Sequence, residues 1–180
     1  MMSANARGLI NSRLENRSCH VSDTPLILEI INEAAQAYRG SIPTDCFHEP
    51  YMSRAQLNTE LSAGVSFQAY QSDGSVIAVM GLQTVRGVDL IRHAYVRPAF
   101  QGTGIGGRLL KTLLNSTRRP VLVGTWAGAE WAIRFYQRHG FTLVKGVARS
   151  ILLETYWSVS ARQRDVSVVL SGPEVEVPKR

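Results

Sequence analysis

The chain has 180 residues and a formal net charge of +6, and its 44% apolar and 19% charged residues are typical of one globular domain. No apolar run approaches the roughly 18 residues that span a bilayer, and the N-terminal residues lack the apolar segment of a signal peptide, so we expect a cytoplasmic protein with no membrane partner. The basic residues are scattered rather than gathered with aromatic side chains, which argues against nucleic acid as a partner.

The first 64 residues predict a flexible leader, one short strand and two helices. Residues 1–16 have no packing pattern and form the predicted leader. Ser22-Asp23-Thr24-Pro25 is typical of a helix start, because a capping side chain precedes a proline suited to the first turn. Ser53 and Gln56 form a capping box that opens the second helix. The strand is expected at 17–21, and the helices are expected to end at Gly40 and near Ala63.

Residues 65–97 predict three strands. Apolar and polar side chains alternate from Val65 to Gln71, as in a half-buried strand, and a more buried strand follows at 76–84. Turn residues at Ser72-Asp73-Gly74 and at Arg86-Gly87 separate these strands from each other and from the third.

The third strand leads into a glycine-rich segment, Gln101-Gly102-Thr103-Gly104-Ile105-Gly106-Gly107, and the apolar spacing after Ile105 is helical. The first N–H groups of a helix have no intrahelical partner and carry the positive end of its dipole. Glycines let an anion approach these donors, so we predict a pyrophosphate site here. Arg97, Arg108 and Lys111 surround the loop and suit an anionic ligand.

Two other phosphate-binding motifs fit this loop less well. Gly102–Gly107 satisfies the G-x-G-x-x-G pattern of dinucleotide folds, but Pro98–Gln101 separates the glycines from the strand, and no acid follows the next strand before Glu130. A P-loop needs a lysine where this chain has Arg108. A nucleotide-binding protein is therefore the weaker alternative.

The remaining chain predicts three strands and one long helix. The strands are expected at 121–125, 141–145 and 166–170, and a helical turn is expected at 152–157. The helix ends at Gly140 and is expected to bury one stripe of side chains, Trp131, Ala132, Phe135, Tyr136 and His139. Cys19 and Cys46 match no metal-ligand spacing, so we expect reduced thiols and no metal.

Two segments resemble one family. Val96–Gly106 resembles the acetyl-coenzyme A loop of the GNAT superfamily of N-acetyltransferases, and Trp131–Phe141 resembles a later helix of that family. The resemblance covers roughly 17–147. It implies an α/β fold with a GNAT-like mixed central sheet of about seven strands, flanked by about four helices. The domain is expected at 17–171, before a flexible tail at 172–180.

The resemblance implies an acyltransferase that moves an acetyl group from acetyl-CoA to a primary amine on a small molecule or peptide. Neither motif holds a cysteine that could carry the acetyl group, so direct attack in a ternary complex is expected. Tyr136 is the implied proton donor to the departing thiolate. The residues implied to hold acetyl-CoA are Val96 for the pantetheine arm, where two central strands splay, and Gln101, Gly102, Thr103, Gly104, Ile105, Gly106 and Gly107 for the pyrophosphate.

The general base stays open. Glu49 is a tentative base, with His48 as its neighbour in the same loop and His93 as a third candidate, but a solvated loop and a core histidine would explain these residues equally. Trp126 and Trp157 either line the acceptor pocket or fill the core.

Relatives often carry a cofactor-binding asparagine where this chain has Ala129. A CoA-binding regulatory or interaction module without turnover is therefore the alternative on the same fold. A homodimer through the last strands also stays open.

Overall fold

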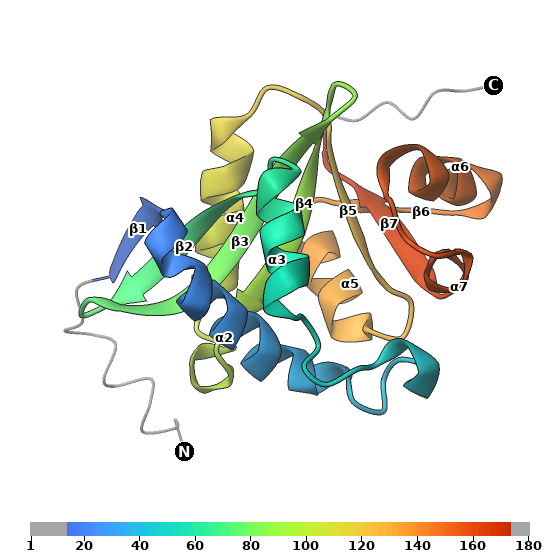
Figure 1. The fold of residues 1–180 in the computed structure, drawn as a ribbon. Coiled ribbons are helices and arrows are strands. Elements are labelled where there is room, and N and C mark those ends of the chain that lie inside the picture. Colours follow the sequence, from blue (N-terminus) through green and yellow to red (C-terminus); the bar gives the residue numbers. More distant parts are fainter. Residues whose placement is uncertain (1–13, 174–180) are drawn as a thin grey trace, which may run out of the picture.

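A computed structural model of the chain describes residues 14–173, in which seven strands form one mixed sheet of order β1-β2-β3-β4-β5-β7-β6 (Figure 1). The strands are β1 (Leu14–Ser18), β2 (Ser66–Ser72), β3 (Ser75–Val85), β4 (Val88–Val96), β5 (Val121–Trp126), β6 (Thr142–Val144) and β7 (Ser167–Ser171). Only β4 and β5 pair in parallel, and every other neighbouring pair is antiparallel. The predicted seven-stranded α/β sheet is confirmed.

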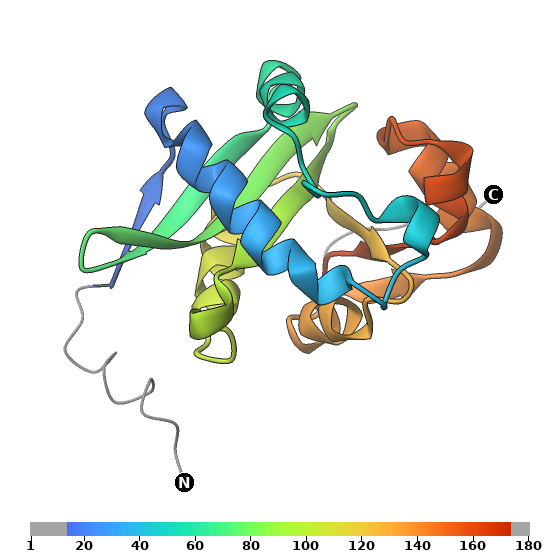
Figure 2. The ribbon, with the colours of Figure 1, turned by 60° about the horizontal axis from the view of Figure 1, so that its bottom comes forward.

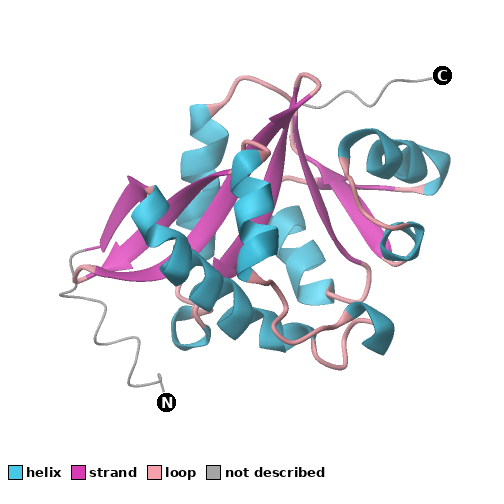
Figure 3. Cartoon of the chain, in the orientation of Figure 1, coloured by secondary structure: helices cyan, strands magenta, loops and turns pink. Residues whose placement is uncertain are grey.

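Helices cover both faces of this sheet (Figures 2 and 3). They are α2 (Thr24–Ala34), α3 (Arg54–Ser62), α4 (Ile105–Ser116), α5 (Glu130–Arg138), α6 (Gly146–Tyr156) and α7 (Ala161–Asp165). On one face α2 and α3 bury Ile27, Ile30, Ile31 and Leu57 against Phe67 and Val79. On the other face α4 buries Ile105, Leu109, Leu110 and Leu113 against Ile91 and Val123. No helix within residues 14–173 has the length and apolar character that a membrane span needs.

The helix count and the first strand differ from the sequence prediction. The segment expected to hold one helical turn forms α6 and α7, so six helices flank the sheet instead of four. The full length of α6 was not predicted, because its apolar residues do not form one continuous buried face. Val147 is 76% exposed, and only Leu152 and Leu153 are buried. The first strand begins at Leu14 rather than at 17, inside the predicted leader. The rest of that leader and most of the predicted tail lie outside the described residues.

The predicted start of α3 is confirmed in detail. Gln56 N donates to Ser53 Oγ at 3.2 Å, and Ser53 N donates to Gln56 Oε1 at 2.8 Å. Each residue satisfies a backbone donor that the helix leaves unpaired, which fixes the first turn of α3.

The two central parallel strands separate after a short paired segment. Only three pairs join β4 to β5, and the last is Ile91 with Val123. Beyond them, β4 contains a bulge in which His93 and Ala94 oppose Met80 of β3. His93 has a φ of +50°, which is uncommon for a residue with a side chain. The gap between the strands is therefore bordered by a strained segment of β4.

Candidate active site

A cavity of about 500 Å³ lies between the end of β4, the start of α4 and one side of α5. Seven of the eight residues predicted to hold the cofactor line it, namely Val96, Gln101, Gly102, Gly104, Ile105, Gly106 and Gly107. The eighth, Thr103, lies outside the lining, and its Oγ1 donates to Phe100 O at 2.6 Å. The structure thus gathers the predicted cofactor residues around one space.

The first glycines of the loop shape a concave backbone. Gly102 and Gly104 have φ values of 76° and 85°, in the left-handed region where a side chain would be strained. The helix starts directly after them, and Arg108 N donates to Gly104 O at 3.1 Å. The N–H groups before Arg108 have no partner within the helix. This arrangement fits the pyrophosphate of a CoA ester.

Gly106 and Gly107 line the cavity and also lie against α5. A Cβ on Gly106 would lie 3.4 Å from the Phe135 ring, and a Cβ on Gly107 would lie 2.6 Å from His139 Nε2. Both neighbours belong to the α5 segment. Gly107 therefore allows α4 and α5 to approach closely beside the cavity, whereas a Cβ on Gly106 would make an ordinary contact.

The sequence predicted that Arg97 lies near the loop as a partner for an anion, but its guanidinium is bound to other residues. Its guanidinium pairs with Glu29 at 2.8 Å and with Glu33, both on α2, and its Nε donates to Val76 O at 3.1 Å. Burial alone would lower the pKa of Arg97, but the two carboxylates outweigh it and raise the pKa. The basic residues that line the cavity instead are Arg138 and His139, at the end of α5.

The sequence predicted that the apolar stripe of α5 is buried, whereas in the structure the whole stripe lines this cavity and only its Phe135 and Tyr136 also pack against the core of the sheet. Of the stripe, only Tyr136 is buried, whereas Trp131 is 40% exposed and His139 is also exposed. Trp131 stacks on Tyr38 with ring centroids 5.8 Å apart. A helix along a groove has the same side-chain period as a helix on a core, so the sequence pattern could not separate the two.

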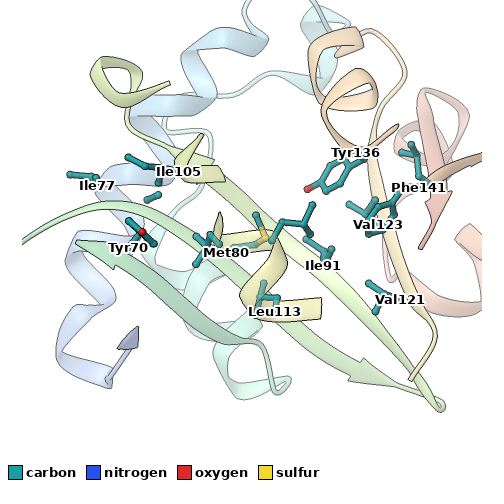
Figure 4. Packing of buried hydrophobic residues seen from close by; sticks show 14 residues of the cluster. Tyr70, Ile77, Met80, Ile91, Ile105, Leu113, Val121, Val123, Tyr136 and Phe141 are labelled. Carbon is teal, nitrogen blue, oxygen red and sulfur yellow. The ribbon is translucent and has the colours of Figure 1, made fainter. Parts of the chain in front are cut away.

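Tyr136 is the buried residue of α5, and it lines this cavity. Its ring packs edge-on against Phe135 and Phe141, and its hydroxyl points away from Phe141 (Figure 4). Burial raises the pKa of Tyr136, with a smaller contribution from Tyr38, so the phenol is protonated at neutral pH. The position is suited to a hydrogen-bond donor.

A second cavity of about 160 Å³ borders the same gap. The two cavities share five lining residues, Tyr38, Ala94, Tyr95, Ala132 and Tyr136. Trp126 and Trp157 both line the second cavity, and both also pack against buried residues. Trp126 Nε1 donates to Tyr51 OH at 2.8 Å, and a Cβ on Gly124 would lie 3.1 Å from the Trp157 ring.

Three tyrosines, Tyr38, Tyr51 and Tyr95, line the second cavity, and two of them, Tyr38 and Tyr95, also line the first. Burial raises the pKa of Tyr38, of Tyr51 and, most strongly, of Tyr95, so all three hydroxyls are neutral. The Tyr38 ring lies 5.4 Å from Tyr51 and 6.3 Å from Tyr95, measured between centroids.

Of the three candidate bases, the structure brings only His93 to the site. Glu49 lines neither cavity; it pairs with Arg39, and both side chains are 58% exposed. His48 also lies outside both linings, whereas His93 lines the second cavity. The Nε2 atom of His93 is buried without a hydrogen-bond partner, 3.4 Å from Glu60 Oε2.

Glu60 is a site residue that the sequence did not indicate. Arg92 Nη2 donates to its Oε1 at 2.7 Å, and His93 lies on its other side. Burial alone would raise the pKa of Glu60, but His93 and Arg92 together lower it, so the carboxylate stays ionised. The residue spacing within α3 does not indicate a role for Glu60, because its partners Arg92 and His93 lie on β4, at or beside the bulge. Within residues 14–173 no cluster of His, Cys, Asp or Glu could hold a metal ion.

An α/β fold with a glycine-lined helix start beside two splayed strands is suited to a phosphate-bearing ligand. Residues 63–143 match the family model described as the acetyltransferase (GNAT) domain. Both sequence motifs lie inside this range. The family model and the solved structures described below thus confirm the resemblance seen in the sequence.

Solved structures share this fold at low sequence identity. An acetyltransferase of the GNAT family from Staphylococcus aureus Mu50 superposes with a TM-score of 0.66 at 17% identity, covering 89% of this chain and 98% of its own. The PaiA N-acetyltransferase from Thermoplasma acidophilum, in complex with coenzyme A, has a TM-score of 0.65 at 16% identity, with coverage of 89% and 98%. The ribosomal-protein-S18-alanine N-acetyltransferase from Escherichia coli has 0.66 at 16%, with coverage of 93% and 98%. No curated protein matches the chain in sequence.

Proposed function

We propose that the protein is an N-acetyltransferase that moves the acetyl group of acetyl-CoA to a primary amine by direct attack in a ternary complex. The observation that carries the proposal is that two cavities meet at the gap between β4 and β5 and share the Tyr136 side chain. Cofactor and amine can then approach one reacting centre from different sides without exchanging places. Solved relatives that bind coenzyme A on the same fold support the assignment of the larger cavity to the cofactor.

The amine must lose a proton before it can attack. An alkyl amine with a pKa near 10.4 is almost entirely ammonium at pH 7, and forming the free base costs about 4.6 kcal/mol. A buried pocket helps, because desolvation disfavours the charged form. A nearby proton acceptor is still needed.

We assign that acceptor role to His93, with Glu60 as the residue that positions it and balances its charge. His93 is the histidine in the lining of the second cavity, and Glu60 Oε2 lies 3.4 Å from its Nε2. In the balanced reaction, the amine nitrogen forms a bond to the acetyl carbon while the carbon–sulfur bond breaks. The ammonium proton passes to His93 before the attack. Tyr136 gives its proton to the departing sulfur, which leaves as the free thiol, and takes up the second proton that the nitrogen loses as the amide forms.

The test is thiol release from acetyl-CoA with both substrates varied. Initial rates that give intersecting double-reciprocal lines support a ternary complex, whereas parallel lines would indicate an acetylated enzyme. Tight binding of acetyl-CoA with no turnover across a broad amine panel would favour the alternative, a CoA-binding module. Failure to bind acetyl-CoA would overturn the assignment of the larger cavity.

A further inference from the structure

We infer that the acceptor is a small monoamine with an apolar or aromatic body and no carboxylate. This inference rests on the proposed function, and it concerns the second cavity, the one of about 160 Å³ beside Trp157. It follows from the charge, the wall chemistry and the size of that cavity.

The cavity offers no partner to a second charge on the ligand. Among its described lining residues none is an aspartate or glutamate, and the basic ones are Arg92 and His93. The guanidinium of Arg92 is already engaged, because Nη1 donates to Gln83 Oε1 at 2.6 Å and Nη2 donates to Glu60 Oε1 at 2.7 Å. A second ammonium would find no anion here, and a carboxylate would find no free guanidinium. Burying either charge without a partner is strongly unfavourable.

The walls favour one ammonium attached to a flat or apolar body. Five aromatic rings from separate segments of the chain line the space, namely Tyr38, Tyr51, Tyr95, Trp126 and Trp157. Aromatic faces attract a single cation and also bury apolar surface. The two indoles are held in place, Trp126 by its bond to Tyr51 and Trp157 by contact with Gly124, so the walls are fixed rather than adaptable.

The volume limits the ligand. At roughly 10 to 15 Å³ per water-sized site, about 160 Å³ holds on the order of ten non-hydrogen atoms. A phenyl ring with a short aminoalkyl chain has this size. Its amino group can reach the gap at Tyr136 while the ring lies among the aromatic walls.

The test compares matched amines in the thiol-release assay. Phenethylamine and phenylalanine differ by one carboxylate, and hexylamine and 1,6-diaminohexane differ by one amino group. We expect kcat/KM to be at least tenfold higher for the monoamine in each pair. Equal or better turnover of phenylalanine, of the diamine, or of a peptide with an N-terminal alanine would overturn the inference and leave the proposed function standing.

A charge introduced into the wall provides a second test. The side chain of Gln163 lines the cavity from α7, whereas its backbone groups bond to Ser160 and Ser167. We expect Gln163→Glu to raise the ratio of kcat/KM for 1,6-diaminohexane to kcat/KM for hexylamine at least fivefold. In the uncharged control Gln163→Met, this ratio should stay below that of the glutamate variant. An unchanged preference in Gln163→Glu would contradict the placement of the amine.

Binding separates this inference from the proposed function. Calorimetric titration of phenethylamine and of phenylalanine into the complex with CoA measures selectivity without turnover. If phenethylamine binds at least tenfold more tightly but no amine is acetylated, the ligand class stands and the enzymatic function falls. If neither amine binds while other amines are acetylated, the ligand class falls.

Discussion

The Nε2 atom of His139 lies 2.6 Å from the point that a Cβ on Gly107 would occupy, so the end of α5 touches the first turn of α4. The imidazole cannot turn away freely, because its Nδ1 lies 2.8 Å from Phe135 O. The two elements that border the larger cavity are thereby held at a spacing at which a Cβ at position 107 would push against the His139 ring.

We expect Gly107→Ala to lower stability by about 1 kcal/mol, because overpacking costs roughly 1–3 kcal/mol while alanine gains up to about 1 kcal/mol of helix propensity. The double variant with His139→Ala should recover the loss. Gly106→Ala is the control, since its Cβ would make an ordinary contact at 3.4 Å with Phe135. Urea unfolding of the four proteins measures this. A Gly107→Ala protein as stable as the Gly106→Ala protein would contradict the clash.

Removing the Tyr136 hydroxyl should impair chemistry and leave binding intact. We expect Tyr136→Phe to reduce kcat at least tenfold, because a positioned proton or hydrogen-bond donor contributes roughly 10²–10⁴-fold. The KM for acetyl-CoA should change little, since the loop glycines hold the phosphates. Tyr70→Phe is the matched control, because Tyr70 is also buried but lines neither cavity. Equal activity of the two variants would remove Tyr136 from the mechanism.

The proposed base makes a pH-dependent prediction. Replacing His93 by Gln should lower kcat/KM at least tenfold at pH 7, and the loss should shrink toward higher pH as more of the amine is already deprotonated. Glu60→Gln should produce a smaller loss of the same sign, because it acts through His93. Glu49→Gln is the control, since this carboxylate is exposed and lies outside both cavities. The pH profiles of the four proteins decide the question, and a larger effect at Glu49 would restore the loop carboxylate as base.

The sequence predicted the parts of the site whose structure depends on residues close to one another in the sequence. The glycine-rich loop and the Ser53 capping box are local, because a few adjacent residues determine their backbone. The pairing of His93 with Glu60 depends on a bulge opposite Met80 and on the packing of α3, which no local pattern encodes. Likewise, Gly124 gave no local sign that it makes room for Trp157, which lies 33 positions further on.

The turn that follows Tyr38 packs directly against Gly128. A Cβ there would lie 1.9 Å from Ser41 O, and Ser41 N donates to Tyr38 O at 2.9 Å. Because a backbone atom cannot move aside as a side chain can, we expect Gly128→Ala to cost about 1–3 kcal/mol of stability. The amine KM should rise severalfold while the dissociation constant for CoA changes less. Thermal unfolding and initial-rate kinetics measure these effects, and an unchanged melting temperature would show that the loop can shift freely.

Stability should fall in acid through Asp23. Two hydrogen bonds join its carboxylate to Arg17 at 2.6 and 2.8 Å, linking β1 to the start of α2. The hydrogen bonding to Arg17 outweighs the opposing effect of burial and lowers the pKa of Asp23 from 3.8 to about 2. A lowered pKa in the folded state means that the contribution is fully present above pH 3.8 and is lost as the pH falls through about 2.

We therefore expect Asp23→Asn to cost about 1–2 kcal/mol at pH 7, after allowing for solvent screening at the partly exposed Arg17. The difference between the variant and the wild type should shrink between pH 4 and pH 2, roughly the interval spanned by the two pKa values. Asp45→Asn is the matched control. Arg162 also binds Asp45 through two hydrogen bonds, but both side chains are more than half exposed, and exposed pairs contribute little. Urea unfolding at several pH values measures both, and a pH-independent effect of Asp23→Asn would show that its carboxylate contributes through shape and not through charge.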